Sequence, residues 1–301
     1  MITLAHDGYR LLADPLHGGA IRALEWTRAN GQTLPLLEPL IDLSIGFKAG
    51  CFAMVPFANR IDHGRFSFAG RDIHLPINLP GEDMAIHGFA RDNAWQMVQH
   101  DAGNLMLAQD FSRPDNPYRY HAVQEITLAD GAVRIAMSIR NTGEETLPFG
   151  LGLHPWFPKT PMAMLAFHAD GALGRDARGL PVGPPAPVAS FNPQNPTPLG
   201  RMDWLDGCFT GWQPRAATII WPERDTCLLL TADGAFTHLH VYVPDQRAVF
   251  CAEPVSHAPD AVNRPELGPG CAMTALEPGQ SLAGSMTFTA FPLRQKNEGQ
   301  Q

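Results

Sequence analysis

The sequence predicts an all-β protein organised as one large β-sandwich, and three observations support this prediction. Apolar and polar residues alternate with a period of two in many segments, which is typical of half-buried strands. Glycine and proline number 28 each among the 301 residues, and both suit turns far better than long helices. We find no helical apolar stripe longer than three turns. Hydrophobic residues make up 45% of the chain, enough for a sizeable core.

The alternation is clearest in residues 132–140, 238–243 and 281–288, and each of these segments predicts a strand with one buried face. Residues 221–231 carry a denser apolar run, for which we also expect a strand. Residues 98–111 have turn-forming residues near their middle and predict a hairpin. Strands that follow one another with few helices between them are typical of a β-sandwich.

A proline-rich stretch divides the chain. Residues 180–199 contain seven prolines, which are compatible with either a linker between domains or a long loop on the surface of one domain. We favour the loop, because the patterns on both sides are of the same β type. Residues 1–293 are therefore expected to form a single domain, and the polar tail 294–301 is expected to be disordered.

Charge and cysteine content limit the class of partner and the compartment. The net charge is −8 and no basic stripe occurs, so a nucleic-acid partner is not expected. The five cysteines form no Cys-x-x-Cys pair, which predicts buried free thiols in a reducing compartment. The first residues lack the features of a signal peptide, and no apolar run is long enough to span a membrane. We expect a cytoplasmic protein, monomeric or homodimeric, with an uncharged small-molecule ligand.

Two basic residues are the first candidates for a functional site. Arg60 follows an apolar segment and Asn59, where a guanidinium needs acceptors such as a carboxylate or ligand hydroxyls. His87 precedes Gly88, and a glycine at this position permits unusual backbone angles or a close approach to a ligand. The structural alternatives are an arginine paired within the protein and a hydrogen-bonded core histidine.

Two further segments carry an imidazole and a carboxylate. His154 is followed by Pro155, which favours an extended backbone, and by Trp156, whose ring offers a stacking face for a sugar. Glu253 lies at the end of an apolar strand and before Pro254, where burial would raise its pKa and make it a stronger base. The structural alternatives are a buried core histidine and a glutamate paired with a surface cation.

In this order and combination the motifs resemble those of the aldose 1-epimerase (galactose mutarotase) family. The resemblance covers nearly the whole chain and is far more specific than any single motif. The matching pieces are Pro-x-x-Asn-Arg-Ile and Gly-x-Phe-x-Phe-x-Gly in residues 56–70, His87-Gly88, His154-Pro155-x-Phe157, Leu205-Asp206, and Glu-Pro with Pro-Asp-Ala-x-Asn in residues 253–263.

The resemblance implies a galactose mutarotase-like supersandwich whose concave face binds a monosaccharide. It implies Glu253 as the catalytic base, His154 as the catalytic acid and His87 as a second active-site histidine near the ring oxygen. It also implies that Arg60 and Asp206 bind sugar hydroxyls.

We add Asn59 and Trp156 to the expected sugar-binding residues. The chain departs from the family pattern at Trp156, where a tyrosine is frequent, and at Ala58, where a proline is frequent. Asp203 lies close enough to Asp206 to compete for the aspartate position.

The chemistry implied by the resemblance needs neither a metal nor a cofactor. One group takes a proton from the C1 hydroxyl, another protonates the ring oxygen, and the opened sugar closes again on its other face. We expect Glu253 and His154 to meet across a pocket that is large enough for one pyranose. We also expect the Glu253 carboxylate to keep His154 protonated near neutral pH.

Three alternatives remain open from the sequence. His238 and His240 point to the same side of a predicted strand and are candidate metal ligands. A non-catalytic sugar-binding module would use the same arginine, aspartate and aromatic residues. An epimerase of the same fold that acts on hexose 6-phosphates would need cations for the phosphate, for which Arg65, Arg71 and Arg91 are the candidates.

Overall fold

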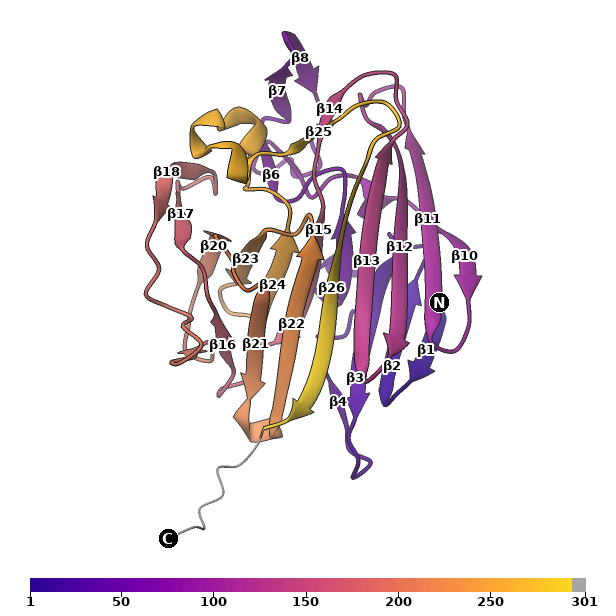
Figure 1. The fold of residues 1–301 in the computed structure, drawn as a ribbon, viewed down its shortest axis with the longest axis vertical. Coiled ribbons are helices and arrows are strands. Elements are labelled where there is room, and N and C mark those ends of the chain that lie inside the picture. Colours follow the sequence, from indigo (N-terminus) through magenta and orange to yellow (C-terminus); the bar gives the residue numbers. More distant parts are fainter. Residues whose placement is uncertain (294–301) are drawn as a thin grey trace.

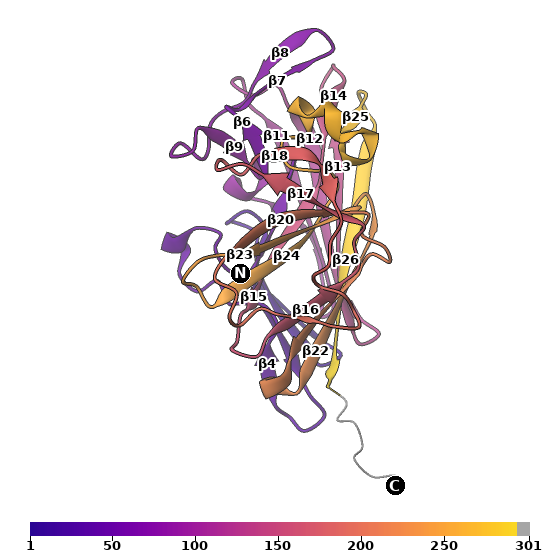
Figure 2. The ribbon, with the colours of Figure 1, turned by 90° about the vertical axis from the view of Figure 1, so that its left-hand side faces the viewer.

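Two large antiparallel sheets stack face to face in the structure, which is a computed structural model that describes residues 1–293 (Figures 1 and 2). The predicted disordered tail, 294–301, lies outside the described residues. Within the described part the helices are six 3₁₀ turns of three residues each: η1 (Leu43–Ile45), η2 (Ala90–Asp92), η3 (Pro222–Arg224), η4 (Ala261–Asn263), η5 (Pro265–Leu267) and η6 (Pro269–Cys271). The prediction of an all-β fold is confirmed.

The first sheet carries the residues of the candidate site. In the described chain it has eleven strands, in the spatial order β1 (Ile2–His6), β2 (Tyr9–Asp14), β3 (Ala20–Thr27), β5 (Cys51–Met54), β15 (Gly152–Pro158), β24 (Val249–Val255), β23 (His238–Val243), β20 (Leu205–Thr210), β17 (Gly171–Arg175) and β18 (Pro181–Ala186), with β4 (Thr33–Pro35) paired to β3.

The second sheet forms the near layer in Figure 1. Its nine described strands are β10 (Gln96–His100), β11 (Asn104–Ser112), β12 (Arg119–Ala129), β13 (Ala132–Asn141), β26 (Ser281–Pro292), β22 (Thr226–Gly234), β21 (Ala216–Trp221), β16 (Met164–Phe167) and β19 (Thr197–Pro198). Three short pairs lie outside the large sheets: β6 (Arg60–Asp62) with β9 (Met84–Ile86), β7 (Arg65–Phe68) with β8 (Arg71–His74), and β14 (Leu147–Phe149) with β25 (Thr274–Leu276).

The alternating segments form the strands that their patterns predict. In β13 the side chains of Val133, Ile135, Met137 and Ile139 are all buried, and the residues between them face outwards. Strands β23 and β26 cover the other two alternating segments, and β10 and β11 form the predicted hairpin. Burying one face of each strand against the opposite sheet is the main contribution to stability that this alternation provides.

The prediction of one strand over residues 221–231 is wrong. Strand β21 ends at Trp221, the turn η3 follows, and β22 begins only at Thr226. Pro222 has no N–H to donate to a neighbouring strand, and Asp225 takes the left-handed backbone conformation that reverses the chain. The apolar run therefore belongs to the second strand of a hairpin, in which Leu228 and Leu230 are buried.

The proline-rich stretch is attached to the sandwich and does not separate two bodies. Part of it forms the edge strand β18, a position where missing N–H donors face away from the sheet. Phe191 is buried and packs against Phe167 and Phe209. The stretch is therefore not a linker. It lies on the surface of the sandwich, as the favoured interpretation had it, but residues 181–186 form a strand that the sequence did not predict.

One hydrophobic cluster includes residues of both large sheets, such as Phe157 and Phe288, whose ring centroids are 5.9 Å apart. This shared core supports our prediction that residues 1–293 form one domain. All five cysteines are buried and free, as predicted. Among residues 1–293, no helix has the length and apolar character needed to cross a membrane.

The strand register brings distant residues into one row across the eleven-stranded sheet. Gly152 pairs with Val255 and Trp156 pairs with Cys251, so His154 lies directly opposite Glu253 on the neighbouring strand. On its other side Glu253 pairs with His240. Side chains in one such row point to the same face of a sheet, and here that face is the one turned away from the core.

Candidate active site

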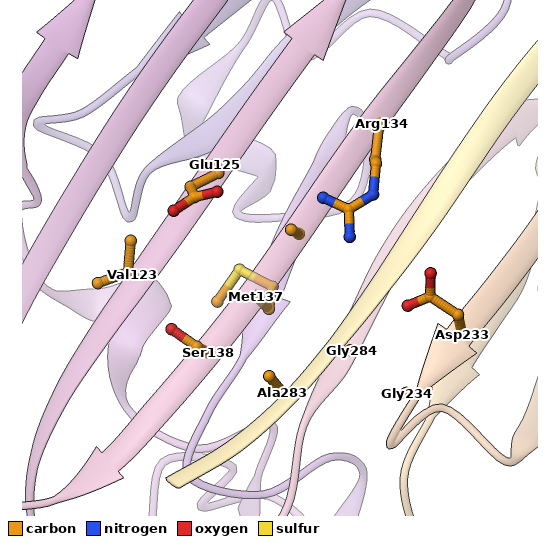
Figure 3. Close-up of a pocket in the computed structure, with 10 residues that line it drawn as sticks. Val123, Glu125, Arg134, Met137, Ser138, Asp233, Gly234, Ala283 and Gly284 are labelled. Carbon is orange, nitrogen blue, oxygen red and sulfur yellow. The ribbon is translucent and has the colours of Figure 1, made fainter.

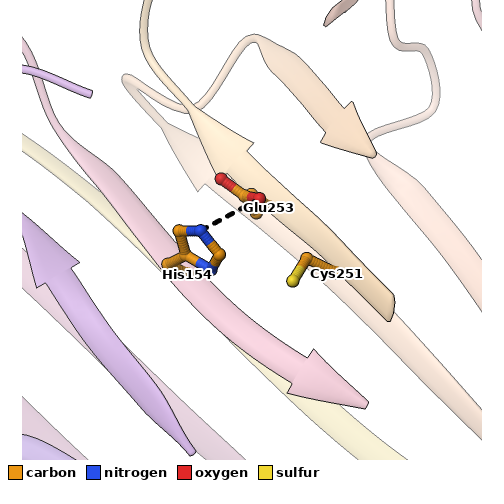
Figure 4. A group of neighbouring side chains, drawn as sticks. All are labelled: His154, Cys251 and Glu253. Carbon is orange, nitrogen blue, oxygen red and sulfur yellow. Dashed lines mark ion pairs between the residues drawn. The ribbon is translucent and has the colours of Figure 1, made fainter. Parts of the chain in front are cut away.

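His154 and Glu253 face each other on neighbouring strands, as the sequence analysis expects (Figure 4). The distance from His154 Nε2 to a Glu253 carboxylate oxygen is 3.4 Å. Both side chains are almost completely buried, with residue exposures of 5% and 2%. An imidazole and a carboxylate from positions almost a hundred residues apart thus form one pair that can exchange a proton after a small approach.

Two aromatic rings fix the orientation of the His154 imidazole. Phe52 stacks on it at a centroid distance of 4.6 Å, and Trp156 stacks at 5.1 Å. Trp156 also donates a hydrogen bond from Nε1 to the carbonyl of Phe47. Because its ring packs between His154 and Arg247 and is only 4% exposed, Trp156 presents no open face for a sugar in this structure.

His87 approaches the pair from a loop. Its ring lies edge-on to His154 at a centroid distance of 5.0 Å, and its Nδ1 accepts a hydrogen bond from the Asn59 N–H. His87 and Asn59 both have a positive φ, at 58° and 56°. Left-handed backbone is costly for residues other than glycine and persists where the surroundings enforce it, frequently at functional sites.

Asp206 is the centre of a charged group beside the pair. His240 Nε2 lies 2.8 Å from one of its carboxylate oxygens, and Arg175 and Arg60 approach the other at 3.3 and 3.6 Å. Burial alone would raise the pKa of Asp206, but the hydrogen bond from His240 and the charges of His240, Arg60 and Arg175 lower it to about 2. Asp203, the competing aspartate, is exposed.

Asn59 joins the loop that carries Arg60 to this charged group. Its Nδ2 lies 3.5 Å from His240 Nε2, and its side-chain oxygen accepts a hydrogen bond from the Arg60 N–H. The structure therefore brings together every predicted site residue. The alternative metal ligands are engaged elsewhere, since His240 contacts Asp206 and the His238 Nδ1 contacts the Thr237 hydroxyl.

The expectation that Glu253 keeps His154 protonated is wrong. Burial lowers the pKa of His154 well below its usual range, and the charges of Arg91 and His240 act in the same direction. Burial raises the pKa of Glu253 well above its usual range, an effect that Asp206 strengthens and Arg60 opposes. Removing a carboxylate and an imidazolium from water costs more free energy here than their electrostatic attraction contributes, so both groups favour their neutral forms.

The pyranose-sized pocket expected between His154 and Glu253 stays a prediction. A cavity lined by Asp206, His240 and Arg175 has a volume of about 10 Å³, enough for roughly one water molecule. A larger hollow of about 330 Å³, lined by Glu125 and Arg134 among others, lies on the nine-stranded sheet (Figure 3). The pair lies on the other sheet.

Comparison with known proteins decides the family. The profile of the family described as Aldose 1-epimerase matches residues 1–289. An uncharacterised protein of Escherichia coli K12, YphB, is 31% identical over 301 residues, which cover 95% of this chain and 97% of YphB. The chain belongs to the aldose 1-epimerase family.

A solved structure and a second relative agree with the assignment of this chain to the aldose 1-epimerase family. The crystal structure of a candidate aldose 1-epimerase from Escherichia coli K12 has a TM-score of 0.86 at 30% identity and covers 97% of this chain and 98% of that chain. Rat galactose mutarotase is 30% identical over 158 residues, 48% of this chain and 45% of the rat protein. The predicted galactose mutarotase-like fold is thereby confirmed.

Two features of this family member that the sequence analysis left without a role hold the Arg60 loop in place. The buried Asp260 side chain accepts hydrogen bonds from the Asp62 N–H and from Asn263, and its own N–H donates to the Arg60 carbonyl. His257 Nε2 accepts a hydrogen bond from the Ala58 N–H at 3.0 Å. The Pro-Asp-Ala-x-Asn motif thus fixes the Arg60 loop. Its resemblance to the family pattern marked the motif as a candidate, but the sequence did not show which segment it contacts.

We expect the epimerase fold to lose stability between pH 6.5 and pH 4 through His257. Burial lowers the pKa of His257 to about 4, although the hydrogen bond with the Ala258 carbonyl acts in the opposite direction. The neutral ring also accepts a hydrogen bond from the Ala58 N–H, and the two hydrogen bonds hold it in place. The unfolded chain has a histidine pKa of about 6.5, so it binds more protons over this interval and stability falls as the pH falls, by about 3 kcal/mol in all.

Urea denaturation at a series of pH values measures this effect. The variant His257→Gln keeps a donor and an acceptor but cannot titrate, and we expect its free energy of unfolding to fall less steeply with acid. The exposed His100→Gln variant serves as the control and should follow the unmodified protein. An unchanged acid slope in His257→Gln would contradict the assignment.

Proposed function

We propose that this protein interconverts the α- and β-anomers of a free aldose. The observation that carries the proposal is the buried pair of Glu253 and His154, 3.4 Å apart and surrounded by His87, Arg60 and Asp206. Membership of the aldose 1-epimerase family supports the same reaction class. The proposed activity requires one group that takes the proton of the C1 hydroxyl and a second group that protonates the ring oxygen, and an imidazole next to a carboxylate can supply both.

In the proposed reaction Glu253 removes the proton from the C1 hydroxyl. The C1–O5 bond breaks, its electron pair stays on O5, and O5 takes a proton from His154 while C1 becomes the carbonyl carbon. Rotation about the C1–C2 bond presents the other carbonyl face, O5 attacks C1 again, and the two protons return. Atoms and charge balance without an oxidant or reductant, and each well-placed acid or base contributes about 10²–10⁴ in rate.

For this assignment the proton shared by the pair must lie on His154 when the sugar is bound. In the structure burial favours the neutral carboxyl of Glu253, and the positive charge of Arg60 favours the carboxylate. Sugar hydroxyls that donate hydrogen bonds to Glu253 would add to the Arg60 effect, because hydrogen bonds to the charged form lower the pKa of a carboxyl group. We propose that sugar binding itself moves the proton.

The remaining residues are proposed to orient the sugar. Asp206 stays ionised and offers acceptor oxygens to hydroxyls, and Arg60 and Asn59 offer donors beside it. Neutral His87, whose Nδ1 already accepts a backbone hydrogen bond, has Nε2 left to donate towards the ring oxygen region. Trp156 is proposed to act indirectly, by holding the His154 ring in position.

Polarimetry of freshly dissolved sugars tests the proposal. The α-anomers of glucose, galactose, arabinose and xylose are each followed with increasing protein concentration. We expect at least one to approach its equilibrium rotation at a rate that rises in proportion to protein. Saturable binding of these sugars without any acceleration would instead identify a non-catalytic sugar-binding module.

A second candidate substrate is a hexose 6-phosphate. Three arginines are expected to bind its phosphate, and the surroundings of one of them, Arg91, favour this substrate. Arg65 and Arg71 lie on the β7–β8 hairpin, where Arg71 pairs with Glu145, so these two do not converge with Arg91. The Arg91 guanidinium, by contrast, lies over the rings of Phe47 and Phe52, and Phe52 stacks on His154.

Arg91 is poorly neutralised for so buried a cation. Its Nε has no hydrogen-bond partner, its nearest carboxylate is that of Asp92 at 3.7 Å, and burial lowers its pKa. A cavity of about 240 Å³ lies beside Arg91 and Phe47. A phosphate bound there would supply the acceptors that the guanidinium lacks.

We expect the variant Arg91→Met to separate the two substrate classes. If the phosphate binds Arg91, KM for glucose 6-phosphate should rise about 10- to 100-fold, the usual effect of losing a hydrogen bond to a charged group. KM for the unphosphorylated sugar should change much less, because methionine retains the apolar contact with Phe47 and Phe52. Equal changes for both sugars would contradict a phosphate site at Arg91.

A further inference from the structure

Three different metal-ligating side chains converge in the acid/base pair. The His154 imidazole nitrogen, the Cys251 sulfur and a Glu253 carboxylate oxygen all lie within 4.8 Å of one another (Figure 4). Cys251 and Glu253 are two residues apart on β24 and therefore point to the same face, and His154 faces them from β15. All three residues are buried.

This donor set matches the preferences of a zinc ion. Thiolate, imidazole and carboxylate are the three side-chain groups that bind Zn²⁺, and an open site uses three protein ligands and leaves a fourth position free. We propose that His154, Cys251 and Glu253 form an inhibitory site for Zn²⁺ or another thiophilic divalent ion. The ion would bind through the same atoms that the proposed reaction uses as acid and base.

The spacing of the three groups requires little rearrangement. His154 Nε2 and the Glu253 oxygen are 3.4 Å apart, longer than an imidazole–carboxylate hydrogen bond. In a tetrahedral zinc site with bonds of about 2.0–2.1 Å, the nitrogen and oxygen ligands are separated by about 3.3 Å. The sulfur needs a separation of about 3.5 Å from the other two, so a closure of ~1.3 Å at most completes the site.

The site has a defined consequence for activity. Binding releases two protons to solvent, one from the Cys251 thiol and one from the neutral Glu253 carboxyl, and leaves both the imidazole nitrogen and the carboxylate committed to the metal. Neither can then accept or donate a proton at the sugar, so metal and sugar exclude each other. Inhibition rests on the proposed function, whereas metal binding itself does not.

Titration of the intact protein with Co²⁺ tests the binding without any assay of activity. Co²⁺ takes the same ligands as Zn²⁺ and gives a thiolate charge-transfer band in the near ultraviolet when sulfur is bound. We expect this band to saturate at one equivalent and to disappear when Zn²⁺ is added. Its absence from the unmodified protein would overturn the proposal, whether or not the protein is an epimerase.

Two cysteine variants assign the band to the proposed sulfur. Cys251→Ala is compared with Cys227→Ala, which removes another buried thiol, from β22 on the other sheet. We expect Cys251→Ala to lose the band and to weaken Zn²⁺ binding by ~100-fold or more, since even outer partners of a metal site contribute up to that factor. A band that survives in Cys251→Ala but is lost in Cys227→Ala would also overturn the proposal.

An activity arm is read separately, with each variant compared with its own metal-free rate. Zn²⁺ should slow anomer interconversion by the unmodified protein, and excess sugar or a chelator should restore it. Cys251→Ala should need at least ~100-fold more Zn²⁺ for the same inhibition. A Co²⁺ band with no epimerase activity would refute the proposed function alone, and activity insensitive to a bound metal would refute the inhibitory role.

Discussion

Replacing Glu253 by glutamine is expected to lower kcat for anomer interconversion by about 10²–10⁴, the usual contribution of a well-placed general base. Glutamine has almost the same shape as glutamate and can hydrogen-bond to the sugar, but it cannot accept the C1 hydroxyl proton. KM should change far less than kcat, because the loss is confined to the transition state. Polarimetric initial rates over a range of sugar concentrations separate the two constants.

The fold of this variant should be unharmed. Burial raises the pKa of Glu253 and favours its neutral form, so a neutral amide adds no desolvation penalty. Glu125→Gln is the matched control, because Glu125 is exposed on the nine-stranded sheet and should show unchanged rates. Retention of full activity in Glu253→Gln with an intact fold would refute Glu253 as the base and leave His154 without its proposed partner.

Substitution of Gly88 by alanine is expected to destabilise the protein by more than about 4 kcal/mol, a large fraction of the stability of an ordinary domain. The added Cβ would overlap the backbone carbonyl of Val55, which cannot move aside as a flexible side chain could. The residue also has φ of +64°, which disfavours any side chain. Denaturant unfolding, or the fraction of protein recovered folded, measures the loss.

Gly131→Ala separates the two contributions. Gly131 has φ of +69°, but a Cβ at this position would meet nothing within 4 Å. Its substitution should therefore cost only about 1 kcal/mol, from backbone conformation alone. Similar losses at both positions would show that the Val55 carbonyl relaxes and that Gly88 does not constrain the loop of His87.

The strands and the two central site residues follow from local patterns. Burial of one face forces a period of two, so the alternation around Val133 and Ile139 marks β13 directly. The motifs around His154 and Glu253 identify the pair because each combines a titratable group with a proline that restricts the backbone beside it. The turn at Pro222 could have been predicted from the sequence, because Pro222 and the three charged residues that follow it precede the apolar run at 228–230.

Composition and motifs by themselves determined the β architecture, the free buried thiols and the candidate imidazole and carboxylate. Only the tertiary structure decided the protonation preferences of His154 and Glu253, since these depend on how much water the surrounding sheet excludes. It alone also placed Cys251 beside them. The physical reason is that strand register determines which residues lie opposite each other on neighbouring strands, and register depends on pairings between segments far apart in the chain.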